Sequence, residues 1–212
     1  MTDKTASVAI PAFPRLDPAT PAFWDVRFAA QFTPWDRGTI PDNLRQLLVS
    51  PSQARRNTLI PGCGAAREVG AFADAGWPVI AIDFSPTAVA IAQARLGDRA
   101  HLVRHGDFFD VGLTHDGFDM IYECAFMCAL PPPLRAAWAA QVGRILPPGG
   151  ILAGYFFFGA APSGPPFGIR REELAARLAP NFTLREDLEP TDSIPVFRGL
   201  ERWMVWQRND TR

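Results

Sequence analysis

Short apolar runs alternate with longer segments of helical pattern along most of the chain. The apolar runs predict β-strands at residues 58–61, 79–82, 101–104, 118–123, 151–158, 182–188 and 201–207. The segments between them predict helices at residues 65–76, 86–96, 132–146 and 170–179. Apolar strands that alternate with helices are typical of a mostly parallel sheet with helices on both faces. The pattern therefore predicts an α/β fold.

The end of the chain departs from this alternation. Residues 189–200 separate the last two predicted strands and have room only for a connection. We therefore expect these strands to pair as a C-terminal antiparallel hairpin. Before the first strand, residues 21–50 predict a helical patch that contains Trp24, Phe28 and Trp35, and then a helix that ends near Val49.

The predicted domain organisation is simple. Residues 1–20 are polar and rich in proline, so we expect a flexible N-terminal arm, followed by a single domain over residues 21–212. The N-terminal apolar stretch is too short and too interrupted by proline for a signal peptide or a membrane span.

A pair of glycines follows the first predicted strand. A ligand can approach the backbone closely at Gly62 and Gly64, because they lack a Cβ and tolerate positive φ. Asp83 ends the second predicted strand, where a carboxylate can accept both hydroxyls of a ribose. Open α/β sheets bind ligands at these carboxyl ends. The two features together indicate a ligand that carries a nucleoside.

The same region distinguishes between the nucleoside-containing cofactors that such a turn could bind. A dinucleotide turn needs a third small residue, and Arg67 occupies that position; the G-K-[ST] of a phosphate-binding loop is also absent from this turn. S-adenosylmethionine needs a glycine turn, an acid for the ribose and a contact for the adenine. Asp107 can accept from the adenine amino group while the Phe108 N–H donates to a ring nitrogen. The three features in this order favour a methyltransferase over a nicotinamide-dependent oxidoreductase.

Net charge and cysteine content limit the binding partners and the cellular compartment that we expect. A net charge of −1 gives no reason to expect nucleic acid or a membrane surface as a partner. The three cysteines, Cys63, Cys124 and Cys128, are scattered and odd in number, which is typical of reduced thiols in a cytoplasmic protein. They form no CxxC pair, and the histidines lack the spacing of ligands on one element, so no metal site is expected.

Further segments of the sequence indicate a particular family of methyltransferases. They are FWDVRFAAQFTPWDRG (23–38), IPGCGAAREV (60–69), IDFSPTAV (82–89), GDFF (106–109), FDMIYECAFMCALPPPLRAAWAAQVGRILPPGG (118–150) and GPPFGI (164–169). With these segments the chain resembles the thiopurine S-methyltransferase family, nearest its plant and bacterial thiol and halide methyltransferases. The resemblance implies a Rossmann-like class I methyltransferase with a seven-stranded sheet, S-adenosylmethionine as methyl donor and a small soft nucleophile as acceptor.

The resemblance also implies the site. The N-terminal aromatic segment, residues 21–50, would cover the cofactor. The expected cofactor-binding residues are Trp24, Phe28, Trp35, Gly62, Gly64, Asp83, Phe84, Asp107, Phe108 and Glu123. The expected acceptor-binding residues are Trp35, Phe126, Met127 and Arg198. No residue is assigned a covalent or proton-transfer role.

One segment departs from the family. Relatives of the thiol and halide branch tend to read Asp-Tyr-Thr-Phe-Phe where this chain reads Glu-Cys-Ala-Phe-Met at residues 123–127. The loss of two hydroxyls makes the pocket more apolar and polarizable, which favours a thiol or a thio-heterocycle over a halide. An arginine near the acceptor would favour a thiolate; Arg67, Arg135 and Arg198 are the candidates.

In-line methyl transfer from a sulfonium to a soft anion depends mainly on alignment, and aromatic faces can stabilise the sulfonium charge. Two other functions remain open on this fold. One is N- or O-methylation of a small secondary metabolite. The other is binding of S-adenosylmethionine without turnover.

Overall fold

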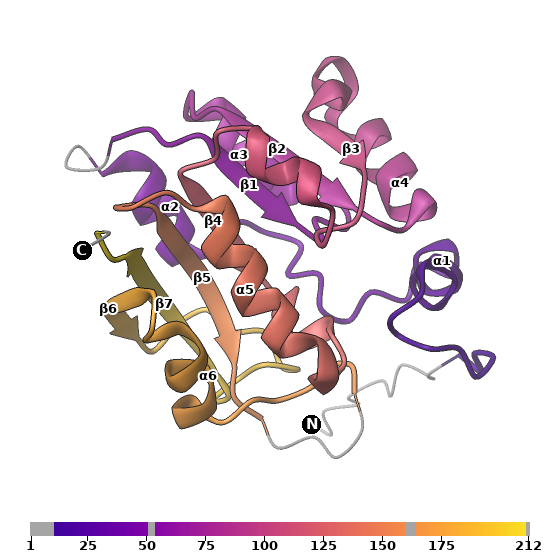
Figure 1. Cartoon of the computed structure of the whole chain (residues 1–212). Helices are drawn as coiled ribbons and strands as arrows, with labels where there is room; N and C mark the ends of the chain where they lie inside the picture. Colours follow the sequence, from indigo (N-terminus) through magenta and orange to yellow (C-terminus); the bar gives the residue numbers. More distant parts are fainter. Residues whose placement is uncertain (1–10, 51–53, 160–163, 211–212) are drawn as a thin grey trace, which may run out of the picture.

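The computed structural model describes residues 11–50, 54–159 and 164–210. A seven-stranded sheet runs through its centre in the order β3-β2-β1-β4-β5-β7-β6 (Figure 1). The strands are β1 (Thr58–Pro61), β2 (Val79–Asp83), β3 (Val103–His105), β4 (Met120–Cys124), β5 (Ile151–Phe157), β6 (Phe182–Leu188) and β7 (Glu201–Arg208). The fold class predicted from the sequence is confirmed.

The pairing directions agree with the expected mixed sheet. β1 to β5 pair in parallel, whereas β7 lies between β5 and β6 and is antiparallel to both. The last two strands therefore form the predicted antiparallel hairpin. β2 lies on one side of β1 and β4 on the other, so the chain reverses its direction of progress across the sheet at this point. Such a switch point opens a crevice at the carboxyl ends of the strands.

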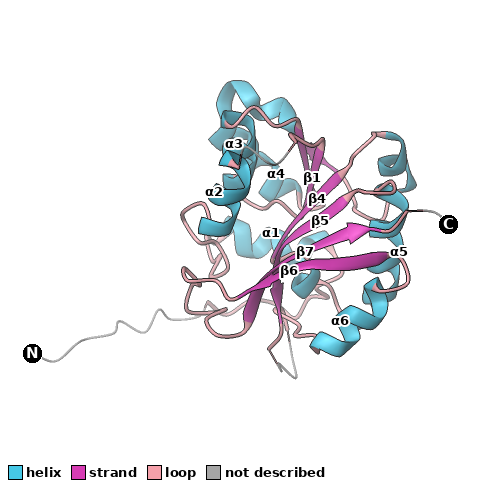
Figure 2. Cartoon of the chain, turned by 90° about the vertical axis from the view of Figure 1, so that its left-hand side faces the viewer, coloured by secondary structure: helices cyan, strands magenta, loops and turns pink. Residues whose placement is uncertain are grey.

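Helices cover both faces of the sheet (Figure 2). The helices α2 (Asp42–Val49), α3 (Arg67–Asp74) and α4 (Pro86–Leu96) lie on one face, and α5 (Arg135–Ile145) and α6 (Arg171–Leu178) lie on the other. Side chains alternate along β1, where Leu59 packs with Trp138 of α5 and Ile60 packs with Phe72 of α3 in two separate cores. Strands buried on both faces explain the continuous apolar runs in the sequence.

Several predicted boundaries needed correction. The helix predicted at 65–76 begins at Arg67, because Ala66 adopts a left-handed conformation with φ of 55° and extends the preceding turn. The helix predicted at 132–146 begins at Arg135, since Pro132–Leu134 forms a 3-10 turn. β3 begins at Val103 rather than at residue 101, because Gly97–Leu102 forms another 3-10 helix.

The N-terminal segment also differs from the predicted helical patch. The helix α1 (Pro21–Ala29) contains Trp24 and Phe28 but ends before Trp35, which lies in a turn between α1 and α2. Of the predicted arm, residues 1–10 lie outside the described residues. The rest of it reaches α1, where the Trp24 Nε1–H donates to the Pro18 carbonyl at 2.9 Å. None of the helices in the described part of the chain has the length and apolar character needed to cross a lipid bilayer.

Asp25 fixes α1 to the start of α4. Its Oδ1 accepts a hydrogen bond from the Ser85 hydroxyl at 2.5 Å and from the Thr87 N–H at 3.1 Å. Ser85 is the N-cap of α4 and accepts from the Ala88 N–H in turn. The carboxylate therefore satisfies a donor at a helix N-terminus, where negative charge is favourable.

We predict that Asp25→Ala loosens α1 while leaving the sheet intact. The loss of two hydrogen bonds to a carboxylate should cost on the order of 1–3 kcal/mol locally. Amide hydrogen exchange should become faster over residues 21–30 and stay unchanged in β1 and β4. The exposed acid Asp98, replaced by alanine, serves as the control; equal exchange in both variants would contradict the anchoring role.

Candidate active site

The glycine turn after β1 is closed by the carboxylate that ends β2. Gly62 and Gly64 have φ of +58° and +49°, which glycine adopts without strain. A Cβ at Gly62 would overlap the ring of Phe126. The Asp83 Oδ2 accepts from the Gly64 N–H at 2.9 Å, and its Oδ1 accepts from the Ser85 N–H at 2.9 Å. Burial raises the pKa of Asp83, and these two N–H groups oppose that effect.

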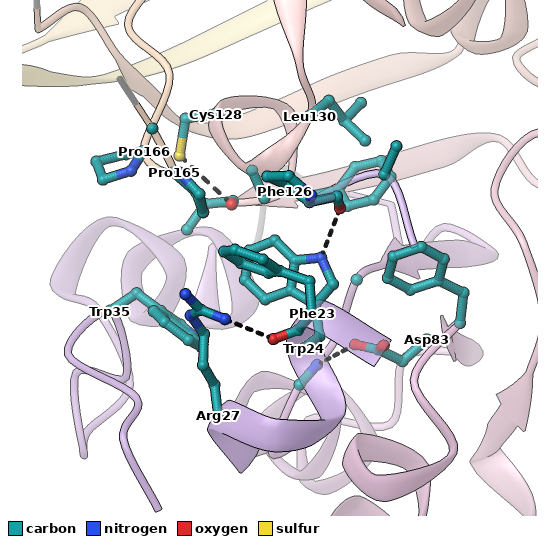
Figure 3. Close-up of a pocket in the computed structure, with 18 of the residues that line it drawn as sticks. Phe23, Trp24, Arg27, Trp35, Asp83, Phe126, Cys128, Leu130, Pro165 and Pro166 are labelled. Carbon is teal, nitrogen blue, oxygen red and sulfur yellow. Dashed lines mark hydrogen bonds between the residues drawn. The ribbon is translucent and has the colours of Figure 1, made fainter. Parts of the chain in front are cut away.

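A cavity of about 490 Å³ opens at this point. It lies at the carboxyl ends of β1, β2 and β4 and is enclosed on the other side by α1 and the turn that contains Trp35. Its wall combines the glycine turn, the ends of the strands, the N-terminal segment and two distant loops at residues 164–166 and 196–197. Figure 3 shows Asp83 and the Pro165–Pro166 pair on opposite sides of the drawn group. The cavity therefore extends well beyond the predicted ribose site.

Most residues predicted to bind the cofactor meet at this cavity. The lining includes Trp24, Phe28, Trp35, Gly62, Gly64, Asp83, Phe84, Asp107 and Phe108. The Asp107 Oδ1 accepts from the Phe109 N–H at 2.9 Å, so one carboxylate oxygen remains for a ligand. The structure brings these residues together from four separate parts of the chain. That the cofactor contacts each of them stays a prediction.

The N-terminal segment brings a cluster of aromatic rings to the cavity in edge-to-face contact. The ring centroid of Trp24 lies 5.5 Å from that of Trp35 and 5.0 Å from that of Phe23, and Phe28 lies 5.9 Å from Trp35. Trp35 also packs against the buried cluster of Cys128, Phe157 and Phe197 at the far end of the cavity. It therefore joins the rings above the glycine turn to the apolar loops opposite.

Glu123 lies directly behind the cavity. It is 1% exposed, and its Oε1 accepts from the N–H groups of Phe126 and Met127 at 2.8 Å each. Its Oε2 is buried and has no hydrogen-bond partner in the described part of the chain. Burial raises the pKa of the carboxyl to about 8, although the two N–H groups oppose this shift. An unpaired buried carboxylate is costly unless a positive ligand group compensates it.

Three predicted residues do not line the cavity. Glu123, in β4, and Met127, in the 3-10 turn that follows, are buried behind the wall. Ala125 occupies that turn with φ of 61°, and it places Phe126 over Gly62. Arg198 is exposed to solvent next to Phe197, the residue whose ring turns inward instead. Phe126 does line the cavity, as predicted.

None of the three arginines considered for thiolate stabilisation reaches the cavity wall. Arg67 pairs with Asp36 at 2.6 Å. Arg135 pairs with Glu173 at 3.3 Å and donates to the Gly168 carbonyl at 2.6 Å. The guanidinium that does line the cavity belongs to Arg27. Its position three residues after Trp24, on the same face of a helix, was the signal in the sequence that could have indicated it.

Sequence reasoning also missed the far wall of the cavity. Cys124, Cys128, Leu130, Pro165, Pro166, Val196 and Phe197 line it. The Cys128 Sγ–H donates to the Ala125 carbonyl at 3.4 Å, and burial raises the pKa of both thiols. The two cysteines therefore contribute neutral, polarizable surface rather than thiolate.

Comparison with known proteins identifies the family. A family model described as thiopurine S-methyltransferase matches residues 19–209. The chain belongs to this family. It is 27% identical over 193 residues to the probable thiol methyltransferase 2 of Arabidopsis thaliana, covering 89% of this chain and 85% of that one. It is 28% identical over 221 residues to a thiopurine S-methyltransferase of Pseudomonas fluorescens (strain SBW25), covering 91% and 94%.

Solved structures agree on the fold. The 1,6-didemethyltoxoflavin-N1-methyltransferase of Burkholderia thailandensis, with bound S-adenosylhomocysteine, superposes with a TM-score of 0.70 at 18% identity over 94% of each chain. The magnesium protoporphyrin IX methyltransferase of Synechocystis, with bound S-adenosylmethionine, gives a TM-score of 0.68 at 13% identity over 93% of this chain and all of that one. Together with the family membership, these findings show an S-adenosylmethionine-dependent methyltransferase.

We predict that Glu123 makes the stability of the free protein depend on pH. Folding raises its pKa from 4.5 to about 8, so in that window the folded state holds a proton that the unfolded chain releases. Stability from this group therefore falls as pH rises from about 5 to about 8. Glu123→Gln should gain stability relative to the wild type over the same range in urea unfolding. A stability difference that does not change with pH would contradict this assignment.

Proposed function

We propose that this methyltransferase acts on a small sulfur nucleophile, a thiol or a thio-heterocycle, by in-line displacement. The observation that carries the proposal is the cavity itself, in which the glycine turn and Asp83 meet an apolar, sulfur-containing wall. A soft, polarizable nucleophile packs well against such a wall. The named activities of the thiol and thiopurine relatives support the same choice.

The residues present fit S-adenosylmethionine. Gly62 and Gly64 keep positive φ and leave the backbone of the turn without side chains, and Asp83 stands where a ribose would need an acceptor. Behind the wall, the buried carboxyl of Glu123 would add a negative charge near the positive ammonium or sulfonium of the donor once it loses its proton. When bound, the donor supplies an electrophilic methyl group on a positively charged sulfur.

The chain's own contribution is orientation and the exclusion of water. Trp24, Phe28 and Trp35 would close over the donor and present ring faces to its charge, worth about 1–2 kcal/mol when desolvated. Residues 21–50 would thus act as the cover of a single domain. No histidine lines the described part of the cavity wall. Alcohols and amines, which depend more on a general base, are therefore the weaker alternative.

Location in the cytoplasm is part of this proposal. Cys63, Cys124 and Cys128 are free thiols in the structure, and reduced thiols are usual in that compartment.

Mass spectrometry of products tests the acceptor class. The enzyme and S-adenosylmethionine are incubated with a panel of thiols, thiopurines, iodide and phenols. We expect S-methylated products from the sulfur acceptors. Methylation of phenols or amines alone would support the secondary-metabolite alternative, and cofactor binding with no product from any acceptor would support a binding protein.

We predict that Asp83→Ala weakens binding of S-adenosylhomocysteine by roughly 1–3 kcal/mol, because hydrogen bonds to a charged acceptor are lost. Calorimetry measures the affinity, and Asp83→Asn serves as the comparison that keeps an oxygen for the Gly64 N–H. Unchanged affinity in both variants would place the ribose elsewhere.

We predict that the cofactor protects the segment from Trp24 to Trp35 against proteolysis. Each ring of this cover would gain a partner on ligand binding, so local opening should become rarer. Limited digestion with chymotrypsin, with and without S-adenosylhomocysteine, measures the effect. Equal cleavage in the two samples would argue against a cover.

A further inference from the structure

One positive charge in the cavity wall has no role in the function proposed above. Arg27 of α1 is the cationic side chain among the described residues that line the cavity. Aromatic rings hold it in place: its guanidinium carbon lies 3.4 Å from the ring centroid of Phe23 and 4.6 Å from that of Phe13. Its Nη1–H donates to the Phe23 carbonyl at 2.7 Å.

The charge of Arg27 is not neutralised within the described part of the chain. No carboxylate there lies within ion-pair distance of it. The two acids of the cavity wall are engaged elsewhere, since Asp83 accepts from two backbone N–H groups and Asp107 accepts from a third. Burial lowers the pKa of the guanidinium, which reflects loss of water without a compensating anion. Its Nε–H and Nη2–H groups have no described partner.

Arg27 is directed away from the glycine turn. The Phe28 ring lies 3.4 Å from where a Cβ of Gly64 would be, so Phe28 faces the glycine turn. The preceding residue on an α-helix points about 100° away. In Figure 3, Arg27 and Asp83 lie on opposite sides of Trp24. The guanidinium is therefore available to the second substrate.

We propose that Arg27 is the specificity-determining residue that recognises a negative charge on the methyl acceptor. The enzyme then prefers an acidic sulfur nucleophile over its uncharged analogue. This inference rests on the proposed sulfur methylation. A guanidinium matches a carboxylate with two parallel hydrogen bonds, and an apolar cavity strengthens the attraction.

The charge can be carried in two ways, by a carboxylate on a thiol or by the nucleophilic sulfur itself. A thiol first loses its proton to water. The sulfur electron pair then forms the new bond to the methyl carbon, while the pair of the breaking bond returns to the donor sulfur. The acceptor becomes a thioether, and Arg27 takes no proton in this step.

Steady-state kinetics with matched acceptors test the proposal. The anionic acceptors are 3-mercaptopropionate and thiocyanate. The uncharged analogue of 3-mercaptopropionate is its methyl ester, methyl 3-mercaptopropionate. We expect the wild type to show higher kcat/KM for 3-mercaptopropionate than for its ester. Arg27→Gln should lower kcat/KM about tenfold or more for 3-mercaptopropionate and less than about twofold for the ester. A parallel loss with thiocyanate would show that charge on the nucleophile is recognised as well.

Two further variants control the interpretation. Arg27→Lys keeps the charge without the planar fork, and it should retain the preference for the acid at reduced strength. Arg45→Gln removes one exposed positive charge from α2, outside the cavity wall, and should change neither acceptor. Thermal unfolding and calorimetry with S-adenosylhomocysteine accompany each variant.

The outcomes separate this inference from the proposed function. A wild type that favours the ester, or an Arg27→Gln effect equal for acid and ester, overturns the role of Arg27. A loss of S-adenosylhomocysteine affinity that accounts for the whole effect also overturns it, because Arg27 would then serve the donor. Failure of the wild type to methylate any sulfur acceptor, with donor binding intact, rejects the sulfur methylation instead.

Discussion

The site depends on the carboxylate of Asp83. One oxygen accepts a hydrogen bond from the Gly64 N–H, and the other accepts one from the Ser85 N–H. A single side chain therefore joins the end of β2 to the turn after β1 and to the turn before α4. The Ser85 hydroxyl in turn donates a hydrogen bond to Asp25 of α1. A buried carboxylate of this kind is stable only while its partners are in place. The positions of the glycine turn and of α1 are therefore linked.

The cavity has two ends of different character. Near Asp83 it offers carboxylates and backbone groups, which suit a polar nucleoside. At the other end it offers proline, phenylalanine and cysteine side chains, and Trp35 packs against both parts. Charges follow the same division. Asp83 lies on the side proposed for the positive donor, and Arg27 lies on the side proposed for the acceptor. This arrangement suits a reaction in which opposite charges meet and neutralise.

The arginines show why charge placement was hard to predict. Arg67, Arg135 and Arg198 are near cavity residues in the sequence, yet two are taken up by ion pairs with Asp36 and Glu173 and the third faces solvent. Arg27 forms no ion pair with any acid that the structure describes, and it stacks on Phe23 and Phe13 instead. The direction of a long side chain depends on partners that are remote in sequence, and spacing alone does not reveal them.

The sequence by itself determined the order of strands and helices, the C-terminal hairpin, the glycine turn and the aspartate that ends β2. These features follow from local pattern, because burial on two faces requires apolar strands and a close approach requires glycine. Only the tertiary structure decided which side chains face the cavity. After the left-handed turn at Ala125, Phe126 faces the cavity and Met127 does not. Loops 164–166 and 196–197 form the far wall of the cavity. Such choices depend on packing between segments far apart in the chain, and a linear pattern carries no record of that packing.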